Sequence, residues 1–193
     1  MDAIFKALRT SLLFVTLLSG CAYHLGNKNR SIPGGYKQVS VPIFKNHTQE
    51  TGIEVSFTNA LIEEFQRSRV ARVVDNSLSE VTVVGQIDDL QYIAGAFRTA
   101  GDSSSPNLPT GTVLASEYRI LLKVSIKILR QSDGKELWRG SFNGERTYPA
   151  PQVTLAGVNS VNPLYNLSAR RQNIDSMAND LMSEAHDRMT ENF

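Results

Sequence analysis

The sequence of 193 residues predicts a single α+β domain over residues 36–193, in which two helices pack on one face of a four-stranded sheet. Three observations predict this class. Apolar residues alternate in four segments, which is typical of strands. In two other segments they recur with helical spacing. The segments follow one another as strand, helix, three strands and helix, so the last three strands are expected to form an antiparallel meander.

The first twenty residues have the order of a secretory signal. Lys6 and Arg9 precede a short apolar run at 12–18, and two small residues end the segment. The run is too short for a membrane-spanning helix, which needs about 20 apolar residues. Residues 1–20 are therefore expected to be a signal peptide, and an N-terminal core helix or anchor is the alternative.

The only cysteine, Cys21, follows this segment directly. The residues LSGC at 18–21 resemble the lipobox of bacterial lipoproteins, which implies cleavage before Cys21 and a covalent lipid on it. Several acyl chains hold a protein stably on a membrane, whereas one chain holds it only marginally. A buried thiol is the alternative. Because residue 22 is alanine and not aspartate, the resemblance implies the outer membrane, on its periplasmic side.

Residues 21–35 carry the lipidated cysteine and a polar tether rich in glycine and asparagine. Within 36–44, Val39, Val41 and Ile43 share one side, which predicts the first strand. Pro42 has no N–H to donate to a neighbouring strand. This strand is therefore expected at an edge of the sheet.

The first helix is predicted over 52–69. Its apolar residues fall on one face, and Thr51 followed by Glu54 is typical of a capping box. The second helix is predicted over 168–189, after a Pro- and Gly-rich connection at 149–165.

Three strands are predicted between the helices, over 80–97, 117–131 and 136–148. The alternation slips in phase near Asp88 and Asp89, which predicts a β-bulge. Asp133-Gly134 predicts a hairpin, and the Ser- and Gly-rich residues 99–116 predict an exposed loop. The expected core places one set of sheet residues under one set of helix residues: Val39, Val41, Ile120, Leu122, Val124, Trp138 and Phe142 under Phe57, Leu61, Phe65, Met177 and Leu181.

Composition excludes several classes of function. Without residues 1–20 the chain carries 18 basic and 18 acidic side chains, so bulk charge does not favour a nucleic acid. One cysteine rules out an internal disulfide and a Cys-based metal cluster. The three histidines lie far apart, and no catalytic or nucleotide-binding motif is present. We therefore expect no enzyme activity, no metal, and no cofactor other than the lipid on Cys21.

The chain from Cys21 onward resembles the LptE family of lipopolysaccharide-assembly lipoproteins. CAYHL at 21–25 is similar to the family's opening, and VPIFKNHTQETGIEVSFTNALIEEF at 41–65 is similar to its strand-to-helix signature. The order of elements also matches. The resemblance implies a non-enzymatic outer-membrane lipoprotein that plugs and helps assemble an LptD-type β-barrel and assists lipopolysaccharide delivery to the outer leaflet.

The resemblance also implies contacts with lipopolysaccharide. An arginine after an aromatic residue ends the family's second strand, and Phe97-Arg98 occupies that place here. A second basic position of the family falls on Gly157, and Arg146 is the candidate to replace it. Arg119, Lys123 and Lys127 indicate a solvated outer sheet face, or one that lines the polar interior of a barrel.

A function from another class stays open. The chain could be an outer-membrane lipoprotein that acts alone and binds a small periplasmic ligand or the cell wall. Co-purification of a large β-barrel would separate the two.

Overall fold

The computed structural model describes residues 30–99, 113–150 and 163–191. The predicted signal peptide, Cys21 and Gly157 lie outside these residues. The described elements, in chain order, are β1 (Gln38–Ser40), β2 (Lys45–Asn46), α2 (Ile53–Ser68), β3 (Arg72–Val73), the 3-10 turn η1 (Asn76–Leu78), β4 (Val81–Ala94), β5 (Phe97–Thr99), β6 (Val113–Ala115), β7 (Glu117–Arg130), β8 (Glu136–Pro149) and α3 (Pro163–Thr190).

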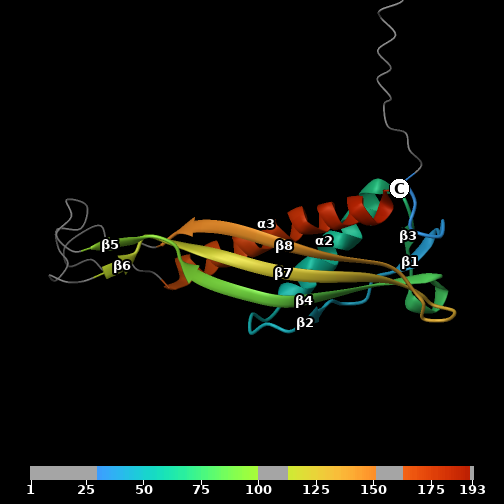
Figure 1. Cartoon of the computed structure of the whole chain (residues 1–193), viewed down its shortest axis with the longest axis horizontal. Helices are drawn as coiled ribbons and strands as arrows, with labels where there is room; N and C mark the ends of the chain where they lie inside the picture. Colours follow the sequence, from blue (N-terminus) through green and yellow to red (C-terminus); the bar gives the residue numbers. More distant parts are fainter. Residues whose placement is uncertain (1–29, 100–112, 151–162, 192–193) are drawn as a thin grey trace, which may run out of the picture.

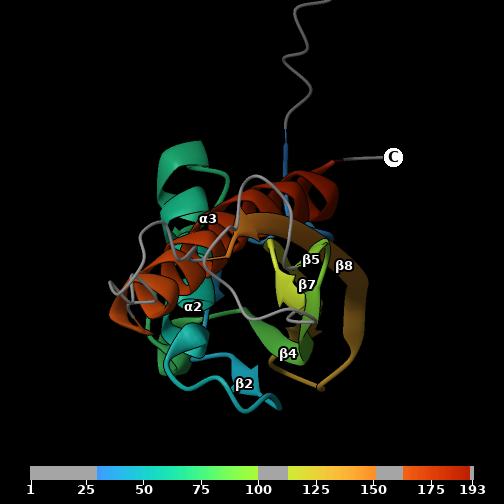
Figure 2. The same cartoon turned by 90° about the vertical axis from the view of Figure 1, so that its left-hand side faces the viewer.

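Two helices cover one face of a mixed six-stranded sheet (Figure 2). The strand order is β3-β1-β4-β7-β8, and β2 also pairs with β4. β1 and β2 run parallel to β4, whereas β4, β7 and β8 form an antiparallel meander. The α+β class, the two helices and the meander are confirmed. The prediction of four strands is wrong, because β2 and β3 are two-residue strands that leave no alternation in the sequence.

The first predicted strand is divided into two by an unpaired segment that contains Pro42. β1 is not at an edge, because β3 pairs with its outer side. Phe44 turns inward instead of Ile43, which is 68% exposed. The N–H of Phe44 donates to Thr58 Oγ1 of α2 at 3.0 Å. This hydrogen bond ties the break in the strand to the helix, where a continuous strand would have left Phe44 on the solvent side.

The long strands β4 and β7 pair over almost their full length. Their register shifts between Ile87 and Asp89, which confirms the predicted bulge. β7 and β8 form the predicted hairpin, and Gly134 in its turn has a φ of +67°, a conformation that glycine adopts without a steric penalty. The antiparallel part of the sheet therefore follows the alternation of the sequence closely.

The two helices match their predicted positions, but the start of α2 differs in detail. Gly52, and not Thr51, precedes the helix, and no side-chain cap is formed there. The Glu54 carboxylate accepts the Gly52 N–H at 3.1 Å and the Asn46 side-chain N–H at 2.9 Å. Half of the predicted capping box is therefore present. α3 begins at Pro163, five residues before its predicted start.

The core lies between the sheet and the helices. The expected core residues are buried except Val41 and Trp138, which are half-buried. Apolar residues of α3 that were not on the expected list also belong to it, among them Ile174, Met182 and Met189. Among the described residues, no helix is long and apolar enough to cross a membrane.

A two-stranded ribbon, β5–β6, projects beyond one end of the sheet (Figure 1). It corrects the predicted loop 99–116, whose described ends are strands; residues 100–112 lie outside the described ranges. The described chain starts at the opposite end (Figure 1). There Arg30 pairs with Asp187 at 2.6 Å, and the Ser31 N–H donates to the carbonyl of Thr190 at 3.2 Å.

Candidate functional site

Arg98, the first implied contact with lipopolysaccharide, lies in the projecting ribbon. It is the central residue of β5 and pairs in register with Leu114 of β6. The chain therefore holds the backbone of this residue in a paired strand at the far end of the molecule, and not in a loop.

Arg146, the second candidate, lies in β8 on the face that the helices cover. Its guanidinium donates to Ser176 Oγ at 3.2 Å and forms an ion pair with Asp180, and both partners belong to α3. The charge of Arg146 is therefore compensated within the chain. A phosphate that binds Arg146 has to compete with the Asp180 carboxylate.

The structure does not bring Arg98 and Arg146 together. Arg146 pairs with Ile120 of β7, and Ile120 pairs with Tyr92 of β4. Arg98 follows Tyr92 by six residues along the same line of strands, which corresponds to about 20 Å at 3.3 Å per residue. The backbones of the two arginines therefore lie in different parts of the sheet.

A cluster of three residues beside Arg146 was not expected from the sequence. The Tyr92 hydroxyl donates to Glu50 Oε2 at 2.9 Å, and Arg170 donates to Glu50 Oε1 at 3.2 Å. The Arg170 guanidinium also lies 5.0 Å from the centre of the Tyr92 ring. Burial, followed by the hydrogen bond to Glu50, raises the pKa of Tyr92.

This cluster joins the loop before α2, the end of β4 and the start of α3. The Nε of Arg170 is buried without a partner among the described residues. The Glu50 carboxylate neutralises the charge of Arg170. The cluster therefore joins elements of the fold and does not offer a free charge. No sequence signal could have found it, since its members are up to 120 residues apart.

The outer face of the sheet carries charges of both signs. Arg119 of β7 pairs with Glu145 of β8 at 3.1 Å, and Lys123, four residues further along β7, is exposed. The pKa of the Glu136 carboxyl is lowered, first by its hydrogen bonds from Arg139 and then by the charges of Arg139 and Lys127. This face is polar, as the alternation of β7 predicts, and it carries acidic side chains beside the three expected cations.

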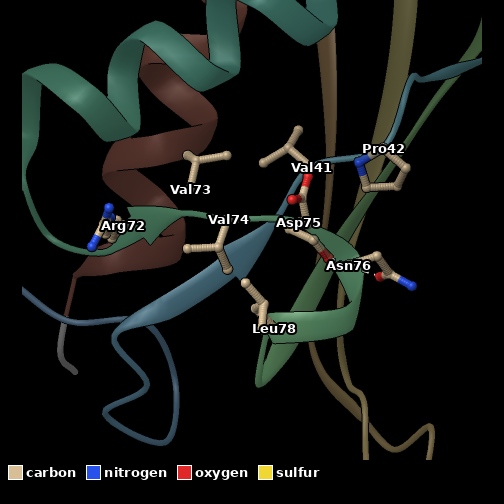
Figure 3. A pocket seen from close by; sticks show the side chains of 9 residues that line it. Val41, Pro42, Arg72, Val73, Val74, Asp75, Asn76 and Leu78 are labelled. Carbon is tan, nitrogen blue, oxygen red and sulfur yellow. Dashed lines mark hydrogen bonds between the residues drawn. The ribbon is translucent and has the colours of Figure 1, made fainter.

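A hollow of about 540 Å³ opens beside the break between β1 and β2. Figure 3 shows Val41, Pro42 and Leu78 around it together with Asp75 and Asn76. Two of its polar side chains are already hydrogen-bonded: Ser40 Oγ lies 3.0 Å from Asn76 Oδ1 and 2.9 Å from Thr82 Oγ1. The hollow is therefore lined by both apolar and polar side chains, and it has no nucleophile and base in contact.

The part of the chain that the structure describes contains no group of histidine, cysteine, aspartate and glutamate side chains that could hold a metal ion. Its polar clusters are ion pairs and hydrogen-bond networks that join elements. Fold and site together define an α+β domain with a projecting ribbon, in which an arginine occupies the centre of one strand.

The model of the LptE family, described as lipopolysaccharide-assembly, matches residues 36–189. The chain belongs to this family. No curated protein sequence matches it.

Several solved structures are similar in fold. Lipoprotein B of Nitrosomonas europaea is 14% identical, with 88% of this chain and 90% of that chain covered and a TM-score of 0.47. Rare lipoprotein B of Shewanella oneidensis is 16% identical, with 79% and 90% covered and a TM-score of 0.40. PelC of Paraburkholderia phytofirmans, a dodecamer, is 13% identical, with 84% and 92% covered and a TM-score of 0.47.

Proposed function

We propose that the chain is an outer-membrane lipoprotein that occupies an LptD-type β-barrel, helps the barrel to assemble and assists lipopolysaccharide delivery to the outer leaflet. The observation that carries the proposal is the family match over residues 36–189, which spans almost the whole described domain. A lipid on Cys21 holds the protein on the periplasmic side of the membrane. The role requires no catalysis, cofactor or metal.

The outer face of the sheet supports contact with a barrel lumen. Large barrels have polar interiors, and this face presents Lys123 together with the Arg119–Glu145 pair. Charges of both signs at the surface of β7 and β8 are compatible with a polar wall and unfavourable against acyl chains.

The test is a pull-down of the full-length protein from detergent-solubilised membranes. We expect a large β-barrel to co-purify and to stay bound at high salt, because salt screens exposed charge pairs but leaves apolar and shape-dependent contacts in place. The control is Leu122→Asp, which keeps the anchor but disrupts the core. The Leu122→Asp variant should recover no barrel. If the wild-type protein recovers no barrel even at low salt, the proposal is contradicted.

A second candidate is a lipoprotein that acts alone on a small periplasmic ligand or the cell wall. The hollow lined by Val41, Pro42 and Leu78 together with polar side chains favours it. Native mass spectrometry of the purified protein and sedimentation with isolated cell wall test this function. A bound small molecule or a cell-wall complex without any barrel supports it over the first candidate.

A further inference from the structure

A second hollow, of about 380 Å³, lies where α2 ends and β3 begins. Its two arginines and its glutamine are exposed, whereas its phenylalanine and its alanine are buried. The lining comes from the last turn of the helix, the turn that follows it and the strand: Phe65, Gln66, Arg69, Ala71, Arg72 and Val73. The hollow therefore combines an apolar part with two cations that are open to solvent.

Neither of these two arginines has an acidic partner among the residues that the structure describes. Carboxylates at this end of the molecule are paired with other cations, Glu64 with Arg67 and Asp187 with Arg30. The hollow thus presents two charges that the chain does not compensate. A guanidinium bonds phosphate oxygens well, often through two parallel hydrogen bonds, so a phosphate group matches this pair of charges.

The backbone of Arg69 also indicates a role for its side chain. Its φ is +55°, the only positive value outside glycine in the described part of the chain. Helices commonly end with a residue in this conformation, and that residue is usually glycine, because a Cβ is unfavourable there. A cation is favourable at the end of a helix, but this does not account for the second arginine, Arg72, which belongs to β3.

Arg72 lies on the side of β3 that faces the end of α2. Figure 3 shows its side chain turned away from Pro42 and Asp75, which line the first hollow. Its backbone N–H donates to the carbonyl of Lys37 at 2.8 Å. Because Lys37 is also exposed, a third cation lies close to the same place.

The hollow lies at the end of the molecule where the described chain begins. Ser68, the last residue of α2, has its Oγ 2.8 Å from Nε2 of His186 in α3. The next residue of α3, Asp187, pairs with Arg30 at 2.6 Å. The ends of both helices therefore meet beside the start of the described chain, as Figure 1 shows.

The tether brings this end close to a membrane. Arg30 is nine residues after Cys21, and an extended chain spans at most about 3.3–3.6 Å per residue. A lipid on Cys21 therefore holds Arg30 within about 30 Å of the leaflet that contains the anchor. Near an anionic membrane surface, each basic side chain strengthens binding about fivefold. A lipid chain and a basic patch commonly act together in this way.

We infer that the hollow between α2 and β3 binds the phosphate of a phospholipid headgroup through Arg69 and Arg72, an inference that rests on the proposed function. The headgroup belongs to the leaflet that holds the lipid anchor. An anionic phospholipid such as phosphatidylglycerol is favoured, because it has no ammonium group to compensate its phosphate. The bound headgroup holds the tether end of the domain against the membrane surface.

The test places the photo-crosslinking residue p-benzoylphenylalanine at Gln66, which lines the hollow between the two arginines in space and leaves both unchanged. The full-length lipoprotein is irradiated in its own membrane. We expect mass spectrometry of the crosslinked peptide to find a phospholipid adduct. The same residue at Val55, a 48% exposed position near the start of α2, is the control and should give no phospholipid adduct.

A double variant, Arg69→Gln with Arg72→Gln, provides the second measurement. It removes both charges from the protein that carries the crosslinker at Gln66, and we expect about tenfold less phospholipid adduct. Lys123→Gln with Arg171→Gln removes two exposed cations elsewhere and should leave the yield unchanged. Circular dichroism should show the same fold in both variants, because all four residues are exposed.

A reconstituted system separates the sources of phosphate. The purified full-length lipoprotein is placed in phosphatidylcholine vesicles with or without phosphatidylglycerol. We expect the adduct yield to rise with the phosphatidylglycerol content. If millimolar inorganic phosphate abolishes the adduct, the hollow is a site for free phosphate and the inference is overturned.

The inference and the proposed function can fail separately. An adduct with lipopolysaccharide or with a protein at Gln66, or an unchanged yield in the Arg69 and Arg72 variant, overturns the inference, while barrel recovery in the pull-down keeps the proposed function. A phospholipid adduct from a protein that recovers no barrel supports the headgroup site and contradicts the barrel role. A wild-type protein that gives neither a phospholipid adduct nor a barrel overturns both.

Discussion

Arg146 shows how a single charged residue shapes an exposed strand. β8 is an edge of the sheet, and an open edge invites pairing with other chains. Arg146 is on the helix-facing side of this strand and is held by Ser176 and Asp180 of α3. A second strand that joined β8 would have to pack beside this inward charge. The residue therefore has a structural role whether or not it meets lipopolysaccharide.

Arg98 is the residue on which we expect lipopolysaccharide binding to depend most. Arg98→Glu replaces attraction for phosphate with repulsion. Binding of lipopolysaccharide should weaken, and more at low salt than at high salt, because salt screens the attraction between charges. A binding titration at two salt concentrations measures this. Arg171→Glu, the same change at an exposed position of α3, is the control and should bind as wild type does. Equal binding by Arg98→Glu at low salt contradicts the role.

His186 makes the stability of the domain depend on pH. Its side chain is 1% exposed, its Nε2 lies 2.8 Å from Ser68 Oγ, and the edge of its ring meets Phe65. Burial lowers the pKa of His186, against the smaller opposing influences of the Glu64 and Asp187 carboxylates. The folded state therefore binds fewer protons than the unfolded chain, whose histidine has a pKa of about 6.5.

The free energy of unfolding should accordingly be highest above pH 6.5 and should fall as the pH decreases below that value. His186→Gln keeps a polar side chain but cannot titrate. Urea unfolding of both proteins at pH 7.5 and 5.5 isolates the histidine, since the other groups are shared. We expect the difference in stability between wild type and His186→Gln to shift against wild type at pH 5.5. If the stabilities of wild type and His186→Gln change by the same amount between pH 7.5 and 5.5, His186 does not cause the pH dependence.

At the scale of elements, the break between β1 and β2 depends on a glycine. Gly85 in β4 lies under the ring of Phe44, and a Cβ at this position would overlap the ring. Gly85→Ala must displace a buried aromatic side chain, so we expect a loss of about 1–3 kcal/mol in unfolding free energy. Gly144→Ala is the matched control in β8. Its Cβ would come 2.8 Å from the flexible end of Met177 and 3.0 Å from Leu181 Cδ1, and both are ends of side chains that can shift. Urea denaturation should rank Gly85→Ala as the more destabilised variant.

The centre of β7 should be the part of the sheet most sensitive to charge. Leu122 is buried, so Leu122→Asp places an unpaired carboxylate in the core and should remove about 4 kcal/mol or more, enough to unfold many domains. Leu121→Asp changes the neighbouring residue, which is half-buried on the outer face. Leu121→Asp should cost about 1 kcal/mol of unfolding free energy. Far-ultraviolet circular dichroism during urea titration distinguishes the two, and equal losses would contradict the assignment of faces.

These elements show what the sequence can reveal. β7 was predictable because every second residue from Ile120 to Ile128 is buried. The bulge in β4 was predictable because it shifts the alternation. The division of the first strand could not be predicted. It depends on the hydrogen bond from Phe44 to α2 and on the close approach of the Phe44 ring to Gly85. The β5–β6 ribbon could not be predicted either, because its strands have three residues each and are too short to show an alternation. Arg170 and Glu50 meet only through the fold, so no spacing in the sequence could predict their contact.

For the whole molecule, we predict that Cys21 carries the membrane anchor. Cys21→Ala should leave the precursor uncleaved by the lipoprotein pathway and without acyl chains, which mass spectrometry of the intact protein measures. Ala22→Asp is the matched control. By resemblance to bacterial lipoproteins it should still be acylated but should remain in the inner membrane. An unmodified Cys21 in the mature wild-type protein would exclude a lipid anchor at this residue.

The two ends of the molecule are separated by a distance that matters at a membrane. β4 and β7 each span 14 residues, about 45 Å at 3.3 Å per residue, and the β5–β6 ribbon continues beyond them. The hydrocarbon core of a bilayer is about 30 Å thick. The described chain begins at the end opposite the ribbon, nine residues after Cys21. A domain that is tethered in the inner leaflet and stands along the membrane normal is therefore long enough to carry its ribbon to the level of the outer leaflet.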